Sequence, residues 1–134
     1  MRNNGCRGFT FMEMVIVVAI IMAIAVVAIP SLQAARIRSN ETSAVRMLHT
    51  LNTAQIQHQS ETGKFASSLP ALRKWITPRL ASGTHTGYLF GVEATPDGYR
   101  LTAQPERVGS TGQRIFHSDQ TLLVTDGDGN DIAP

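Results

Sequence analysis

The stretch that decides the fold is Phe9–Pro30, with the sequence FTFMEMVIVVAIIMAIAVVAIP. Every residue from 14 to 29 is apolar, and only Thr10 and Glu13 interrupt the run back to Phe9. A helix over this run would be about 31 Å long, close to the thickness of a bilayer core. A helix of a soluble domain would present a polar face, and this stretch has none. The pattern predicts a single transmembrane helix over residues 9–30.

Two cleavable signals also contain an apolar run, and both fit this sequence less well. A secretory signal peptide has an apolar core of about 7–15 residues and then a small-residue cleavage site. Here the run is longer and ends in Ala28-Ile29-Pro30, where the proline would hinder cleavage. A lipoprotein signal places its cysteine after the apolar run, whereas Cys6 precedes it. We therefore expect the segment to act as a membrane anchor.

The flanking charges give a weak indication of orientation. Arg2 and Arg7 precede the apolar run, and Arg36 and Arg38 follow it, so the positive-inside rule favours a cytoplasmic N-terminus only slightly. The stretch before the run is too short to form a domain, whereas residues 31–134 are long enough to form one. We therefore expect a single pass through the inner membrane, with the N-terminus in the cytoplasm and a globular head outside.

Composition excludes several functional classes. The chain has 134 residues, enough for one domain, and its formal net charge of +2 argues against a charge-driven nucleic-acid-binding protein. One cysteine, Cys6, rules out an internal disulfide and a cysteine-based zinc site. The four histidines lack metal-binding spacing, and neither a nucleophile elbow nor a phosphate-binding loop occurs. We therefore expect the protein not to be an enzyme.

Glu13 is the one charge between Arg7 and Arg36, and it stands inside the apolar segment. A carboxylate at bilayer depth costs about 2.5–3.5 kcal/mol. One interpretation is local, because an acid in the first turn of a helix is favoured by the helix dipole. The other is that Glu13 pairs with a cation in a bundle of helices, which gains about 4 kcal/mol before desolvation at a separation of about 4 Å. Such a pair would fix the register in which the helices pack.

The N-terminal residues resemble those of type IV pilins and type II secretion pseudopilins. The resemblance rests on a basic leader that ends in Gly8, the aromatic Phe9, Glu13, the long apolar run and Pro30. In that family a membrane prepilin peptidase cleaves after the glycine and methylates the new N-terminus. The resemblance therefore implies a leader peptide over residues 1–8, cleavage between Gly8 and Phe9, and N-methylation of Phe9.

The same resemblance implies a function and a set of partners. The chain would be a structural subunit of a type IV pilus or a pilus-like filament, either a pilin or a type II secretion pseudopilin. Its partners would be further copies of itself, the prepilin peptidase, a pilus or type II secretion assembly platform, and the inner membrane. The assembled filament would be periplasmic or on the cell surface. Phe9, Glu13 and Pro30 would serve assembly, with the Phe9 amine of one subunit beside Glu13 of its neighbour.

The rest of the sequence predicts an α+β, type IV pilin-like fold in which the long helix packs on a small antiparallel sheet. Residues 31–62 lack Gly and Pro and form the amphipathic half of the helix, which ends before Gly63. Its apolar stripe, at spacings of three and four, is Ala44, Met47, Leu48, Leu51 and Ala54. Residues 63–134 form the head. There we expect a short helix at 69–74 that ends before Pro78, a loop at 81–86, and a meander of three or four strands at 88–92, 99–104, 114–118 and 121–125.

An acidic stretch near the end of the head is a candidate metal site. Asp126, Asp128, Asn130 and Asp131 supply oxygen ligands at close spacing, which suits calcium, and the intervening glycines permit a tight path. The stretch departs from an EF-hand, because its sixth position is Asp131 instead of glycine. Type II secretion pseudopilins are similar in having a calcium site near the C-terminus. Calcium is therefore one interpretation, and a solvated acidic turn is the other.

Two alternatives to a filament subunit remain open. The first is a single-pass, membrane-anchored binding module that never polymerises, which predicts no cleavage at Gly8 and tolerance of Glu13→Ala. The second keeps the pilin fold and makes the head a DNA receptor, with Arg73, Lys74 and Arg79 close together in the sequence. Acidic residues elsewhere balance these three cations, which argues against a nucleic-acid partner.

Overall fold

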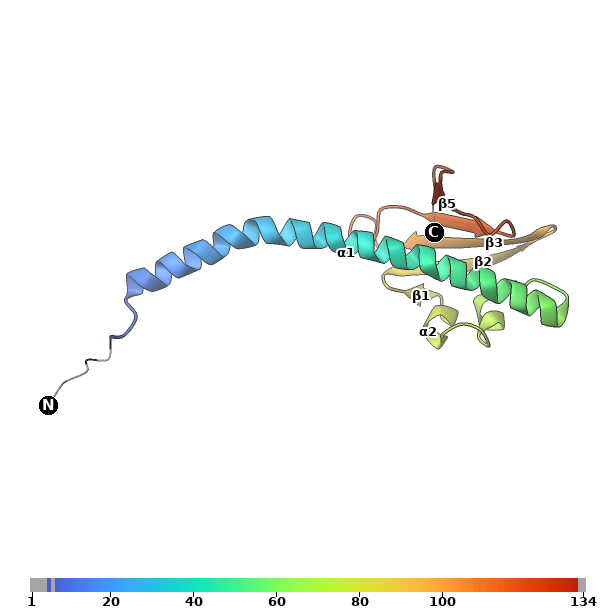
Figure 1. Cartoon of the computed structure of the whole chain (residues 1–134), viewed down its shortest axis with the longest axis horizontal. Coiled ribbons are helices and arrows are strands. Elements are labelled where there is room, and N and C mark those ends of the chain that lie inside the picture. The colour runs from blue at the N-terminus through green and yellow to red at the C-terminus, as the bar shows by residue number, and fades with distance from the viewer. Residues whose placement is uncertain (1–4, 6, 133–134) are drawn as a thin grey trace. The chain divides into compact units, whose positions relative to one another are not determined.

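The computed structural model describes residue 5 and residues 7–132 (Figure 1). Most of the predicted leader, including Cys6, lies outside the described residues, as do the last two residues of the predicted head. The chain divides into two compact units, Met1–Ala34 and Ala35–Pro134. Helix α1 (Phe11–Thr62) contributes residues to both units.

In the unit Met1–Ala34, helix α1 is a single apolar rod. Its large side chains are exposed along the whole described length, from Phe11 at 82% to Leu32 at 54%. The helix is long and apolar enough to cross a membrane, with a mean hydropathy of 3.0 over its most apolar window. Exposure of so large a continuous apolar surface to water is unfavourable, so this segment needs lipid or other protein around it.

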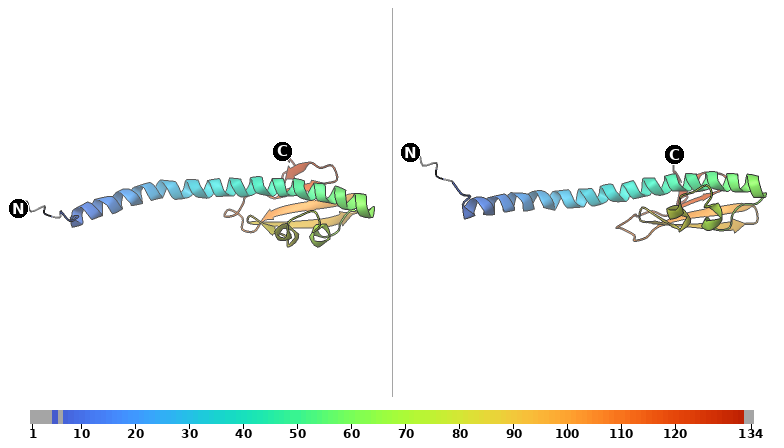
Figure 2. Two further views of the ribbon diagram at one scale, coloured as in Figure 1. Left: turned by 60° about the horizontal axis from the view of Figure 1, so that its bottom comes forward. Right: turned by 90° about the horizontal axis from the view of Figure 1, so that it is seen from below.

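The unit Ala35–Pro134 is an α+β head, in which the last part of α1 packs on a six-stranded sheet (Figure 2). Each strand pairs antiparallel with the next one along the chain, so the sheet is a meander. The strands are β1 (Thr84–His85), β2 (Tyr88–Thr95), β3 (Gly98–Pro105), β4 (Phe116–Asp119), β5 (Val124–Asp126) and β6 (Asp131–Ile132). The predicted fold class is confirmed.

The sheet has more strands than the three or four that we expected. Strand β1 lies in the stretch that we predicted as the loop 81–86, and β6 follows the acidic turn. Each contains two residues, too few for an alternating pattern to be visible in the sequence. The predicted strand at 121–125 begins only at Val124, because the Asp119 side chain accepts hydrogen bonds from both the N–H and the hydroxyl of Thr121 and holds a turn there.

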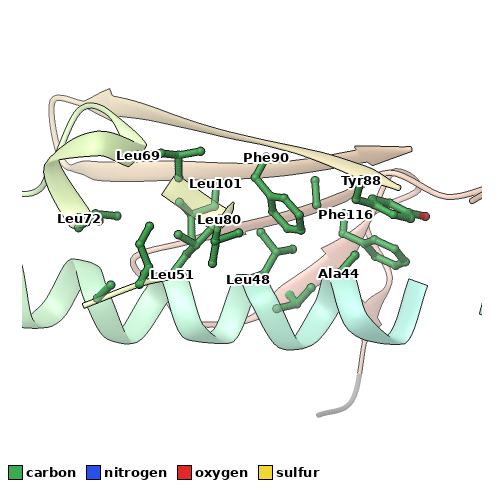
Figure 3. Close-up of a cluster of buried hydrophobic side chains, with 14 of the residues drawn as sticks. Ala44, Leu48, Leu51, Leu69, Leu72, Leu80, Tyr88, Phe90, Leu101 and Phe116 are labelled. Atoms are coloured by element: carbon green, nitrogen blue, oxygen red, sulfur yellow. The ribbon is translucent and has the colours of Figure 1, made fainter. Parts of the chain in front are cut away.

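The core lies between the sheet and one face of α1 (Figure 3). Ala44, Leu48 and Leu51 of the predicted stripe are completely buried, and Ala54 is 1% exposed. Met47 of that stripe is only partly buried. The sheet and its connections contribute Leu69, Leu72, Leu80, Tyr88, Phe90, Tyr99, Leu101, Ala103, Phe116 and Val124. Each large buried side chain contributes about 1.5–3 kcal/mol, so this layer carries most of the stability of the head.

The segment between α1 and the sheet differs in detail from its prediction. Helix α1 ends at Thr62 as expected, and Gly63 takes the left-handed conformation, with φ of 77°. The expected helix at 69–74 is a single 3-10 turn, η1 (Leu69–Leu72). Pro78, expected only as the residue before which a helix ends, begins a second short helix, α2 (Pro78–Ala81). A proline is tolerated in the first turn because the N–H groups there have no hydrogen-bond partner within the helix.

Candidate assembly site at the first turn of helix α1

Thr10 and Glu13 bind each other at the start of α1. The N–H of Thr10 donates to Glu13 Oε2 at 2.7 Å, and the N–H of Glu13 donates to Thr10 Oγ1 at 3.2 Å. This reciprocal pair is a capping box, which satisfies N–H groups that the first turn of a helix leaves without partners. The sequence analysis missed Thr10, although the signal was present as the pattern Thr-x-x-Glu before an apolar run.

The capping box agrees with the local interpretation of Glu13 as an acid in the first turn of a helix, and the role of Glu13 in assembly stays a prediction. Glu13 is exposed, and only its Oε2 atom accepts a hydrogen bond from the described residues. Thr10 therefore holds the carboxylate through Oε2, and Oε1 accepts no hydrogen bond from the described residues. A carboxylate held in this way loses little further side-chain entropy when it pairs with a cation.

The predicted cleavage site precedes the helix. Gly8 and Phe9 lie outside regular secondary structure, and the Phe9 side chain is 80% exposed. A Cβ atom built on Gly8 would meet nothing within 4 Å among the described residues. The peptide bond between Gly8 and Phe9 is therefore in an open stretch of backbone, as an endopeptidase requires.

Pro30, the third predicted assembly residue, lies inside α1 without ending it. A proline has no N–H, so the helical hydrogen bond to the carbonyl of Val26 is missing. The Ser31 hydroxyl nearby donates to the carbonyl oxygen of Ala28 at 2.9 Å, which is not the carbonyl that Pro30 leaves without its donor. Pro30 therefore weakens the hydrogen bonding of α1 locally, at the boundary of its apolar run.

The four candidate calcium ligands lie together in the β5–β6 hairpin. Asp126 Oδ1 accepts the backbone N–H groups of Asp128 at 3.1 Å and Asn130 at 2.9 Å. These bonds, above all the one from the Asn130 backbone, hold the pKa of Asp126 below its usual range. Among residues 5 and 7–132, the structure has no group of three or more His, Cys, Asp or Glu placed to hold a metal ion. Calcium binding therefore stays a prediction.

Of the basic residues considered for DNA binding, Arg73, Lys74 and Arg79, one is paired with an acidic side chain. Lys74 Nζ lies 2.7 Å from Glu61 Oε1 and 5.1 Å from the centroid of the Trp75 ring. One of the three cations is thus neutralised by an acid of α1. His58 packs edge-on against the same Trp75 ring.

Comparison with known proteins supports the resemblance that the first residues suggested. Residues 3–29 match the family model described as the prokaryotic N-terminal methylation motif. The chain is also 40% identical over 72 residues to the "Type IV wide pilus major component PilA4" of Thermus thermophilus, an alignment that covers 54% of this chain and 53% of that protein. The chain thus spans about half the length of this curated relative.

The motif, the relative and the fold are three separate observations that agree. The motif covers the capping box and most of the apolar run, and the head has the α+β arrangement expected for a pilin. Together they show that the chain is similar to type IV pilins, in its N-terminal methylation motif and over about half of its length.

Proposed function

We propose that the protein is the subunit of a type IV pilus or pilus-like filament, and that it polymerises through its N-terminal helix. The observation that carries this proposal is the position of Glu13, a carboxylate held by Thr10 at the start of the apolar, exposed segment of α1. An isolated charge at that position is unfavourable in a membrane, and a cation from a neighbouring subunit would remove the penalty.

The mechanism is packing, with processing as its first step. Prepilin peptidase removes residues 1–8 and methylates the amine of Phe9, which creates a new cation beside the apolar helix. The chain waits in the inner membrane with its N-terminus in the cytoplasm and its head outside. An assembly platform then brings subunits together, and the Phe9 amine of one subunit pairs with Glu13 of the next. The apolar helices form the filament core, and the heads form its surface.

The intact mass of the protein tests the processing step. The full chain is expressed in a host that has an active prepilin peptidase, and the mature species is expected to lack residues 1–8 and to carry one added methyl group. Gly8→Ala serves as the uncleaved control. An unprocessed wild-type chain, beside a control prepilin that is cleaved, would contradict the proposal and favour a membrane-anchored binding module.

Variants of Glu13 test the polymerisation step separately. Glu13→Ala is expected to be cleaved normally and to remain in the membrane while the yield of sheared filaments falls by at least tenfold. Glu13→Asp keeps the charge on a shorter side chain and is expected to recover part of the yield. Normal filament yield from Glu13→Ala would show that this carboxylate does not fix the register.

The choice between a pilus and a secretion pseudopilin rests on the head. The β5–β6 hairpin brings the predicted ligands Asp126, Asp128, Asn130 and Asp131 into one turn, and a calcium site there would favour the pseudopilin. The partial relative is a pilus component and favours the pilus. Deletion of the gene, scored for filaments and for export of secreted enzymes, separates the two roles.

A further inference from the structure

The turn between β4 and β5 exposes two adjacent leucines, which we call the leucine knob. Leu122 is 42% exposed and Leu123 is 55% exposed. Neither belongs to the buried core of the head or to the partly buried side chains that pack against that core. Adjacent apolar side chains that stay exposed add little to the stability of a single chain, and such patches mark contacts with other molecules.

Leu122 also stands in an unfavourable backbone conformation. Its φ is 66°, in the left-handed region, where a bulky side chain is strained and glycine is favoured. The turn is held in this shape, because the N–H of Leu122 donates to the carbonyl oxygen of Asp119 at 3.0 Å and the N–H of Thr121 donates to the Asp119 side chain at 2.8 Å. A strained leucine whose side chain is not packed in the core points to a role outside the single chain.

A groove of about 290 Å³ opens beside α1, in the same unit Ala35–Pro134. Val45 and Ile132 supply apolar side chains to its lining, and Arg46 and Arg114 supply cations. An apolar cavity of about 150 Å³ accommodates benzene, so this groove is large enough for a leucine side chain. No residue of the β4–β5 turn lines the groove, and the knob and the groove are therefore separate surfaces of one head.

The groove carries a net positive charge. Glu41 in its lining is 7% exposed, and its Oε2 lies 2.9 Å from an amino nitrogen of the Arg114 guanidinium, so these two charges balance. Arg46 is exposed and forms no ion pair within the part of the chain that the structure describes. One arginine of the groove is therefore left to attract an acidic partner.

The surroundings of the leucine knob carry the opposite sign. Glu93, Arg100 and Asp119 lie opposite one another on β2, β3 and β4, so they share one face of the sheet. Two acids and one arginine leave one net negative charge on this row, whose last member, Asp119, precedes Leu122 by three residues. Knob and groove thus each combine apolar side chains with a net charge, and the two charges are of opposite sign.

We propose that the leucine knob of one subunit inserts into the groove of a second copy of this chain during assembly. The contact joins two different surfaces, and contacts of this heterologous kind repeat from copy to copy into an open filament, whereas a symmetric contact closes at a dimer. The proposal rests on the polymerisation in the proposed function and adds a contact between heads. Two leucines bury far less than the roughly 1,200 Å² of a stable interface, so the contact should form only within filaments.

Site-directed disulfides test the contact. Two full-length chains are co-expressed in a Cys6→Ser background, one with Leu122→Cys and the other with Thr42→Cys, at an exposed threonine of the groove. We expect a disulfide-linked dimer in sheared, mildly oxidised filaments, because a disulfide needs two Cα atoms within about 7 Å. Either variant alone should give no dimer, since a heterologous contact keeps like positions apart. Leu122→Cys with Arg73→Cys, at an exposed position elsewhere in the head, is the control pair.

Leu122→Gly separates the contact from the folding of the head. Glycine removes the side chain and is favoured at positive φ, so the thermal midpoint of the head should stay equal or rise. The yield of sheared filaments should nevertheless fall about tenfold, because the burial of one leucine is lost. Leu122→Met keeps an apolar side chain in the same backbone conformation and should keep the yield. A purely structural role for Leu122 would move midpoint and yield in the same direction.

A charge variant tests the groove. Arg46→Glu reverses the charge of the exposed arginine and should lower the fraction of linked dimers about threefold, because the groove would then repel the acidic row beside the knob. Arg73→Glu makes the same change at an exposed position outside the groove and should leave the fraction unchanged.

Three outcomes would overturn the proposal. The first is normal filaments in which Leu122→Cys and Thr42→Cys do not link. The second is a dimer from Leu122→Cys alone, which would show a symmetric contact between knobs. The third is an unchanged filament yield from Leu122→Gly. Each of these leaves the proposed function standing, whereas a wild-type chain that forms no filaments would overturn the function and this inference together.

Discussion

The hydroxyl group of Tyr99 on β3 donates a hydrogen bond to Asn52 Oδ1 on α1 at 3.0 Å, and both side chains are buried. The Asn52 amide also donates to Ser118 Oγ on β4 at 2.8 Å. The hydroxyl of Ser118 donates in turn to the carbonyl oxygen of Leu123 at 2.8 Å. One asparagine of the helix is thereby bonded to two neighbouring strands, which fixes the helix along the sheet as well as against it.

Replacing Asn52 by Ala should destabilise the head by about 1–3 kcal/mol, because the buried Tyr99 hydroxyl would lose its acceptor. The measurement is urea unfolding of the full chain in detergent, followed by near-ultraviolet circular dichroism. Tyr99→Phe removes the orphaned hydroxyl, so the double variant should be less destabilised than the sum of the two single ones. Strict additivity would mean that the hydrogen bond contributes nothing.

Gly112 should not tolerate a side chain. A Cβ atom there would overlap the hydroxyl and ring of Tyr88, whose hydroxyl is held by the carbonyl oxygen of Arg114. We expect Gly112→Ala to cost about 1–3 kcal/mol through overpacking, measured as a lower thermal midpoint. Gly91→Ala on β2 is the matched control, since a Cβ there meets nothing within 4 Å among the described residues. Equal midpoints for the two variants would contradict this reading of the packing.

Stability should fall steeply in strong alkali. Burial raises the pKa of both Tyr88 and Tyr99 to about 12, from about 10 in the unfolded chain, and the nearby Glu41 and Asp119 respectively add to the effect. Because the pKa of each tyrosine is higher in the folded state, the neutral hydroxyls contribute fully to the free energy of unfolding below pH 10. That contribution is lost as the pH rises from about 10 to about 12. Thermal midpoints across that interval check this, and Tyr99→Phe should make the decline shallower.

Asp126 makes the stability of the head depend on pH in the acidic range, and its hairpin offers a test for calcium binding. Its lowered pKa means that its stabilising hydrogen bonds persist above the usual Asp range and are lost as the pH falls through the folded value. If the hairpin also binds calcium, the ion should raise the thermal midpoint, by the equivalent of about 2.7 kcal/mol at a hundredfold excess over Kd. Asp128→Ala should abolish that rise. A wild-type midpoint that calcium leaves unchanged would identify the stretch as a solvated turn.

Thr10→Val should loosen the first turn of α1. The valine keeps the shape of threonine and removes the oxygen that accepts the Glu13 N–H, at a cost of about 1 kcal/mol. Faster amide hydrogen exchange of Glu13 and its neighbours in detergent micelles is the expected result. Thr10→Ser retains the hydroxyl and should exchange like wild type. Unchanged exchange in Thr10→Val would show that the capping box does not order this turn.

The sequence by itself determined the apolar helix, its family motif and the face of α1 that packs on the head. These depend on residues that are neighbours in the chain, so a run without polar residues or a spacing of three and four is sufficient to reveal them. The alternation in residues 88–92 and 99–104 likewise predicted the central hairpin, which the structure extends to β2 and β3. The predicted assembly residues Phe9, Glu13 and Pro30 likewise lie within one stretch of the chain, and the pairing of Thr10 with Glu13, three positions apart, is local as well.

Tertiary structure alone decided the contacts between distant residues. Asn52 with Tyr99, Gly112 with Tyr88, and Asn40 with Thr111 are separated by 47, 24 and 71 positions, and local periodicity carries no information on such pairs. The two-residue strands β1 and β6 exist only because β2 and β5 offer them hydrogen-bonding partners. The position of the β3–β4 loop arises for the same reason, since the bonds of Asn40 and Glu41 bring it to a part of the helix that precedes it by about 70 residues.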